Sequence, residues 1–144
     1  MTHEDRGNYK AKHSSESKLD QKIARALEKK TADGKITCAD ASDIAEEVGA
    51  SMKEVGLAID LMEIEINKCQ LGLFGYSPRK MVVKPAEAVQ VGLEKAIRSA
   101  LVNNRLPCAA AWGIAKTSGI PKMAVSSACE ALKIKVKPCQ LGAF

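Results

Sequence analysis

Cysteine is the residue type whose spacing in this sequence most directly suggests chemistry. Four of the five cysteines recur at an interval of 70 residues, as the pairs Cys38 with Cys108 and Cys69 with Cys139. Thiolates are soft ligands and redox groups, so one hypothesis is a redox switch or a metal or iron–sulfur site. We favour the alternative that they are small buried apolar side chains. Two cysteines per half cannot complete a tetrahedral site, and the only histidines lie in the polar N-terminal stretch.

Residues for catalysis are not assembled in any recognisable pattern. Two histidines, His3 and His13, give no set of nucleophile, base and acid. The Gly-Leu-Phe-Gly stretch at 72–75 lacks the Lys-Ser/Thr that follows in a phosphate-binding loop. Asp60, near Glu63 and Glu65, is interpreted as part of a solvated helix end. We therefore expect a protein that is not an enzyme and that has no cofactor and no metal.

The charges of the chain are unevenly distributed. The formal net charge is +5 over 144 residues. Residues 23–76 carry six Lys/Arg and ten Asp/Glu, whereas residues 93–144 carry eight Lys/Arg and two Asp/Glu. Halves of opposite sign indicate halves with different roles, or halves that face each other.

Composition and hydropathy are those of an ordinary globular protein. Aromatic residues make up only 3% of the chain, so Ala, Ile, Leu and Val must form the core. No apolar run is long enough to span a bilayer, and residues 1–6 do not have the pattern of a signal peptide. These features predict a cytoplasmic protein without membrane contact.

An internal repeat organises the sequence. A shift of 70 residues aligns positions 19–74 with positions 89–144 without a gap, and it places the phrase Cys-Gln-Leu-Gly at 69–72 on the same phrase at 139–142. Cys129 takes the place of Ile59 in the repeat, which predicts a core position. Two repeats are too few for a solenoid, so the alignment predicts two similar small domains that arose by duplication.

Each repeat has the same predicted order of elements. Helical spacing of apolar residues predicts a first helix from the capping serines at 14–17 to about residue 32, and from Pro85 in the second copy. A short strand, a helix over 39–48, a glycine turn and a helix from Ser51 follow. Alternation over 64–66 and 69–73 then predicts two strands that form a hairpin.

The turn between the second and third helices carries a family resemblance. The first copy reads Ile44-Ala45-x-x-x-Gly49-x-Ser51-x-x-x-Val55-x-x-Ala58, and the second copy reads Ile114-Ala115-x-x-x-Gly119-x-Pro121-x-x-x-Val125-x-x-Ala128. With a helix before and strands after, each copy resembles the winged helix-turn-helix superfamily over nearly all of residues 17–144.

The resemblance implies a mainly α fold with small β-hairpins, arranged as two tandem winged helix-turn-helix domains. The expected parts are a disordered polar tail (1–16), an acidic domain 1 (17–76), a connector (77–84) and a basic domain 2 (85–144).

The resemblance also implies that the third helix reads the major groove of DNA. In domain 1 the aligned positions lack the side chains that make bidentate base contacts, and the surrounding acids would repel phosphates. We therefore expect domain 2 to dominate. The candidate nucleic-acid-binding residues are Lys122, Ser126, Ser127, Arg105, Lys116, Lys133, Lys135, Lys137, Arg79, Lys80 and Lys53.

The sequence thus predicts a DNA-binding, or alternatively RNA-binding, protein, such as a transcriptional regulator or a chromosome-associated factor. The alternative for the lysines is a merely solvated face. The alternative for the protein is a non-enzymatic interaction module that uses domain 1 for a protein partner or for self-association. A thiol-based redox or metal sensor is the third hypothesis.

Overall fold

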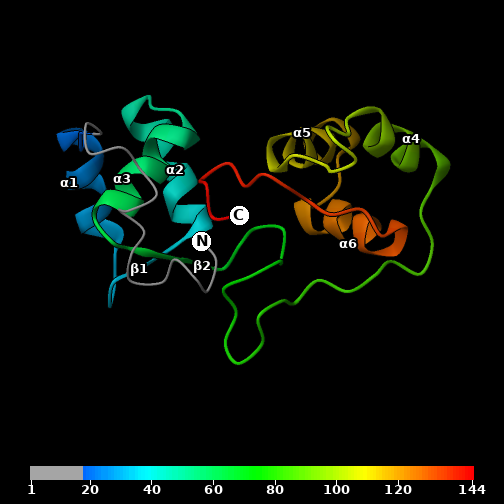
Figure 1. Cartoon of the computed structure of the whole chain (residues 1–144), viewed down its shortest axis with the longest axis horizontal. Coiled ribbons are helices and arrows are strands. Elements are labelled where there is room, and N and C mark those ends of the chain that lie inside the picture. Colours follow the sequence, from blue (N-terminus) through cyan, green and yellow to red (C-terminus); the bar gives the residue numbers. More distant parts are fainter. Residues whose placement is uncertain (1–17) are drawn as a thin grey trace. The chain divides into compact units, whose positions relative to one another are not determined.

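The computed structural model describes residues 18–144, and the predicted polar tail at 1–16 lies outside these residues. Contacts divide the chain into two compact units. Of the described residues, unit 1 contains those from 18 to Cys69 together with Gln140–Phe144, and unit 2 contains Gln70–Cys139. In Figure 1 the red segment at 140–144 accordingly belongs with the helices α1 to α3 of unit 1.

Unit 1 consists of three helices and two short strands. In chain order they are α1 (Gln21–Lys30), β1 (Lys35–Thr37), α2 (Cys38–Val48), α3 (Met52–Leu61) and β2 (Glu65–Asn67). The Asp20 side chain caps α1, and the serines at 14–17 that are predicted to start this helix lie outside the described residues. Ser51 caps α3 through a reciprocal capping box with Glu54, which satisfies two backbone donors at this helix end.

Unit 2 repeats the three helices of unit 1. They are α4 (Val91–Ser99), α5 (Cys108–Ser118) and α6 (Lys122–Leu132). The predicted start of the first helix at Pro85 is wrong, because residues 84–86 are attached to α6 instead. Ala86 N donates to Ser127 O at 3.0 Å, and the Ser127 hydroxyl donates to Lys84 O at 2.6 Å.

The predicted turns between the second and third helices are confirmed in both units. Gly49 and Gly119 each end a helix in the left-handed conformation, with φ of 69° and 67°. Glycine adopts this conformation without the steric penalty of a Cβ atom. The conserved turn geometry lets α3 and α6 begin at the same distance after their preceding helices.

The strands pair differently from the prediction. β1 and β2 form a parallel two-stranded sheet with Lys35 opposite Glu65 and Ile36 opposite Ile66. In unit 2 a single parallel bridge joins Leu106 and Val136. The described part of the chain contains no antiparallel hairpin after either third helix, so the predicted hairpin over 64–66 and 69–73 is wrong.

The physical reason is that residues 71–72 bond elsewhere. The Leu71 carbonyl accepts a hydrogen bond from the Ser126 hydroxyl, and the Gly72 carbonyl accepts from the backbone N–H groups of Val82 and Val83. A returning strand would need these groups for β2. The fold is therefore mainly helical with a small parallel sheet.

The cores of both units are aliphatic and small, as the low aromatic content predicts. Each buried set comes from all three helices and the strand positions. In unit 1 it includes Ile23, Leu27, Ile36, Ala41, Ile44, Val55, Ile59 and Ile66, and in unit 2 it includes Ile97, Leu106, Ala111, Ala115, Val125, Ala128 and Cys129. The predicted core position of Cys129 is thus confirmed, at 1% exposure. No helix within residues 18–144 is long and apolar enough to cross a membrane.

Candidate nucleic-acid interface

Four cations gather beside the parallel bridge of unit 2. We define the basic stripe as Arg105, Lys133, Lys135 and Lys137, all of which are exposed. The segment that carries the lysines is held in place by two backbone hydrogen bonds, from Leu106 N to Lys135 O and from Lys137 N to Leu106 O, each 2.9 Å long. In an extended segment alternate residues point to opposite sides. Ile134 is accordingly buried, while its lysine neighbours face solvent.

The register places two like charges side by side. Because Leu106 is bridged to Val136, Arg105 lies opposite Lys135 on the neighbouring segment. Like charges directly opposite one another on paired strands are destabilising. Within residues 18–144 no acidic side chain forms an ion pair with any member of the basic stripe. An anion bound there would relieve this repulsion.

The aligned positions of unit 1 carry the reverse charge. Glu63, Glu65 and Asn67 stand where unit 2 has the three lysines of the stripe, and Glu65 forms an ion pair with Lys35 at 3.9 Å. The backbone is the same at the start of the segment, because Glu63 and Lys133 both have positive φ, 53° and 58°. Unit 1 therefore neutralises the site that unit 2 leaves positive.

The third helix of unit 2 offers less than the sequence predicted. Ser126 is fully buried, and its hydroxyl donates to Leu71 O at 2.6 Å, so its assignment as a nucleic-acid contact is wrong. Ser127 donates its hydroxyl to Lys84 O. The Lys122 ammonium lies 4.7 Å from the centre of the Trp112 ring, in a cation–π contact that holds it near α5.

The remaining predicted cations are exposed but separate in the sequence and in the fold. Lys116 lies near the end of α5, Arg79 and Lys80 lie in the connector, and Lys53 lies on α3 of unit 1. Val83 and its neighbours show that the connector is not a free linker: Val83 is buried and its N–H group donates to Gly72 O. The structure brings together four of the predicted residues, which are those of the basic stripe.

Four of the five cysteines are buried, and Cys139 is partly exposed. Cys38 and Cys108 are the first residues of α2 and α5, and both are buried, as are Cys69 and Cys129. Burial, with a smaller effect of the Glu130 carboxylate, raises the pKa of Cys129 to about 11. Among the described residues no three His, Cys, Asp or Glu side chains come close enough together to hold a metal ion.

Acidic side chains of unit 1 also depart from the expectation. Asp60, interpreted from the sequence as part of a solvated helix end with Glu63 and Glu65, is only 1% exposed. Its burial on α3 removes it from the surface that a ligand would meet.

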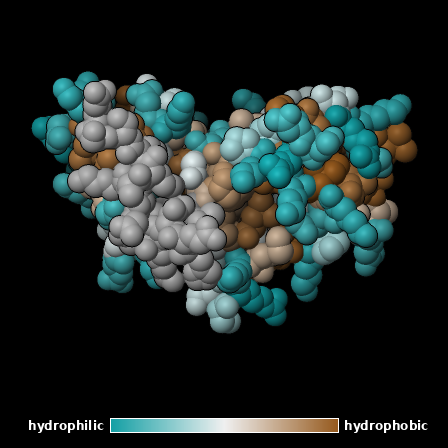
Figure 2. Space-filling model, in the orientation of Figure 1, coloured by the Kyte–Doolittle hydropathy of each residue, from teal (hydrophilic) through white to brown (hydrophobic). Residues whose placement is uncertain are grey.

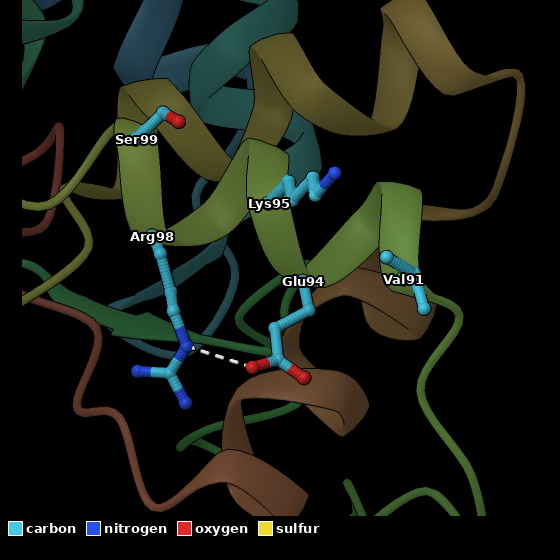
Figure 3. A pocket seen from close by; sticks show the side chains of 5 residues that line it. All are labelled: Val91, Glu94, Lys95, Arg98 and Ser99. Atoms are coloured by element: carbon cyan, nitrogen blue, oxygen red, sulfur yellow. Dashed lines mark hydrogen bonds and ion pairs between the residues drawn. The ribbon is translucent and has the colours of Figure 1, made fainter.

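A shallow pocket runs along one face of α4. Val91, Glu94, Lys95, Arg98 and Ser99 line it, and all five side chains in Figure 3 come from this one helix. Arg98 Nε donates to Glu94 Oε2 at 2.8 Å, so this acid and base neutralise each other. The visible face of unit 2 in Figure 2 carries many hydrophilic side chains around smaller hydrophobic areas. These features give the pocket no charge comparable with that of the basic stripe.

Comparison with known proteins does not assign the chain to a family. No protein-family model matches it, and neither a curated protein nor a solved structure is significantly similar to it.

Two features of the site escaped the sequence interpretation. One is that Arg105 and Lys135 are neighbours. The aligned residues Lys35 and Glu65 have opposite charges, and this would be the signal if the two segments were assumed to pair in parallel. The other is the hydrogen bond from the Ser126 hydroxyl to the Leu71 carbonyl, which no local sequence pattern predicts.

Proposed function

We propose that this protein is a non-enzymatic nucleic-acid-binding protein that contacts the phosphate backbone of duplex DNA through the basic stripe of unit 2. The observation that carries the proposal is the position of Arg105 opposite Lys135, where the aligned residues of unit 1 form an ion pair. From this activity we expect the protein to act in the cell as a transcriptional regulator or a chromosome-associated factor.

The charge of the whole unit supports the proposal. Residues 70–139 carry eleven Lys/Arg and three Asp/Glu, a net charge of +8, and the rest of the chain has a net charge of −3. A positive field of this kind attracts a polyanion and speeds its association. The acidic side chains of unit 1 would instead repel phosphates.

The geometry of the stripe favours a repetitive anion over a single small one. Lysines at alternate positions of an extended segment are spaced by about 6.6 Å, and their flexible stems can each reach a separate phosphate. Phosphate contacts fix position without reading sequence. Because Ser126 is buried and Ser127 is bonded to Lys84, α6 offers few groups for base edges, and we expect little sequence preference.

The test is a titration of fluorescent duplex DNA at several salt concentrations. For the wild type, affinity for DNA should fall steeply as the salt concentration rises. The reason is that lysine and arginine side chains release the counterions of the DNA when they bind its phosphates, and this release is less favourable at high salt. The variant Lys133→Glu with Lys135→Glu should bind at least about tenfold more weakly, with a salt slope smaller by about 2, since each lost phosphate contact lowers the slope by about one.

The matched control is Lys22→Glu with Lys29→Glu, which makes the same change in net charge on exposed positions of α1 in unit 1. It should bind within about twofold of the wild type. Equal losses in the two variants would mean that only net charge matters, and the stripe would not be the site. If the wild type binds neither DNA nor RNA at low salt, the proposal fails and the interaction-module hypothesis becomes the stronger one.

A further inference from the structure

The duplicated phrase Cys-Gln-Leu-Gly marks the places where the chain passes from one unit to the other. Cys69 is the last residue of the first stretch of unit 1, and Gln70 begins unit 2. Cys139 is the last residue of unit 2, and Gln140 returns to unit 1. Each repeat therefore gives its final segment to the unit that contains the three helices of the other repeat.

In unit 2 the incoming segment docks on α6. Leu71 is completely buried, and its carbonyl accepts the 2.6 Å hydrogen bond from Ser126. The next residue, Gly72, lies against α6 and the connector, since a Cβ atom at its position would be 3.1 Å from the Met123 sulfur and 3.2 Å from Val83 Cβ. This segment is joined to the rest of unit 2 by continuous chain.

In unit 1 the corresponding segment docks on α3. Leu141 and Ala143 are 2% and 1% exposed. Gly56, which aligns with Ser126, makes the approach possible: a Cβ atom there would overlap the Leu141 carbonyl oxygen and lie 2.7 Å from its carbonyl carbon. The same contact is thus made twice, by Leu71 with Ser126 and by Leu141 with Gly56.

The exchange of final segments makes only one of the two units discontinuous in sequence. Unit 2 is one continuous stretch, whereas unit 1 depends on five residues that follow unit 2 in the chain. Just before those five residues the chain is fixed to unit 2, because Cys108 N donates to Pro138 O at 3.0 Å. Loss of residues 140–144 from α3 would leave every contact within unit 2 in place.

We infer that residues 140–144 are a strap that closes unit 1 and can detach from α3 without unfolding unit 2. Detachment would uncover the apolar positions beneath Leu141 and Ala143 and open unit 1 by local unfolding, as a separate cooperative unit. The acidic unit could then open and close while the basic stripe stays folded. The inference concerns the strap alone and holds whether or not the stripe binds nucleic acid.

The test uses Gly56→Ala in the full chain, with Gly113→Ala as the matched control. Both substitutions replace a helical glycine, and both gain helix propensity. At Gly113 no atom lies within 4 Å of an added Cβ, whereas at Gly56 the added Cβ meets the strap backbone.

Amide hydrogen exchange followed by mass spectrometry reports each unit separately. In Gly56→Ala, exchange should accelerate by about tenfold or more in α3, β2 and residues 140–144, and it should not change in α4 to α6. Gly113→Ala should exchange no faster than the wild type in either unit, and its gain in helix propensity can only slow exchange in α5. Unchanged exchange in unit 1 of Gly56→Ala, or equal acceleration in both units, would overturn the inference.

If Gly56→Ala does not fold, the variant Leu141→Ala tests whether the strap detaches independently of unit 2. Leu141→Ala removes a buried anchor of the strap and leaves α3 unaltered. It should raise exchange in unit 1 and leave unit 2 protected. Loss of protection in unit 2 as well would show that the two units unfold together, and the strap would not be a separate element. No nucleic acid enters either measurement, so failure of the proposed DNA binding cannot be confused with failure of this inference.

Discussion

The segment after α3 and the segment after α6 start in the same backbone conformation and pair in the same direction, but they carry opposite charges. Both begin with a residue at positive φ, Glu63 or Lys133, and both run parallel to the strand before the second helix. Glu65 is neutralised by Lys35, while Lys135 lies opposite Arg105. The comparison teaches that the two repeats preserve the positions that shape the backbone and differ in the exposed ones. A difference in function would then lie in side chains that the fold does not need.

The largest expected effect on DNA binding comes from copying the basic segment into unit 1. Glu63→Lys with Glu65→Lys gives unit 1 the lysines of the stripe beside Lys35, in the register of unit 2. We expect DNA affinity to rise by about tenfold at low salt, with a salt slope steeper by about 2, because two further phosphate contacts become available. Titrations of fluorescent duplex DNA at several salt concentrations measure both quantities.

The control for this exchange is Glu46→Lys with Glu47→Lys, which makes the same charge change on exposed positions of α2. If this variant gains as much affinity as the first, the register of the segment is irrelevant. The comparison between the two segments would then reduce to net charge.

The largest expected effect on stability is at Cys129, which occupies the core position that Ile59 has in unit 1. The pKa of Cys129, raised to about 11, exceeds the ordinary value of 9.0. Above pH 9 the unfolded chain releases this proton while the folded chain keeps it, so the free energy of unfolding falls as pH rises towards 11. The loss is about 2 kcal/mol by pH 11.

Urea unfolding between pH 8 and 11, for the wild type and for Cys129→Ala, measures this dependence. The variant has no thiol to ionise, so the gap between the two stability curves should narrow as pH rises. Curves that stay parallel would show that the Cys129 thiol titrates alike in the folded and unfolded chains.

The smallest expected effect is at Ser126, the counterpart of Gly56. Ser126→Ala leaves the buried Leu71 carbonyl without its side-chain donor, which should lower the free energy of unfolding by about 1 kcal/mol. Urea denaturation measures the loss. Affinity for DNA should not change in the folded variant, because the hydroxyl is not at the surface. A clear loss of affinity at unchanged stability would return Ser126 to the binding site.

Local features of the fold could be predicted from the sequence. The turns at Gly49 and Gly119, the start of the third helix at Ser51 and the core position of Cys129 each depend on residues a few positions apart, and each is confirmed. Local sequence specifies such features because turn conformation, capping and helical periodicity act over one or two helical turns.

Long-range features could not be predicted in the same way. Alternation at 69–73 reads equally well as a strand and as a docked segment, and only the contact with Ser126 distinguishes the two. The parallel pairing of β1 with β2 also depends on the path of the residues that follow β2, because these residues do not return to pair with it. Four of the predicted site residues share one surface, but their grouping follows from that pairing and not from their spacing in the sequence.

The discontinuity of unit 1 has a consequence in time. During synthesis the residues of α1, α2 and α3 leave the ribosome before those of unit 2, yet Leu141 and Ala143, which complete their packing, leave it after unit 2. Unit 2 has all of its residues once Cys139 has emerged. Domains usually complete their folding in the order in which they are made. Here the order is reversed: unit 1, which is translated first, lacks residues 140–144 until unit 2 has been made, and the apolar positions that they cover stay exposed until then.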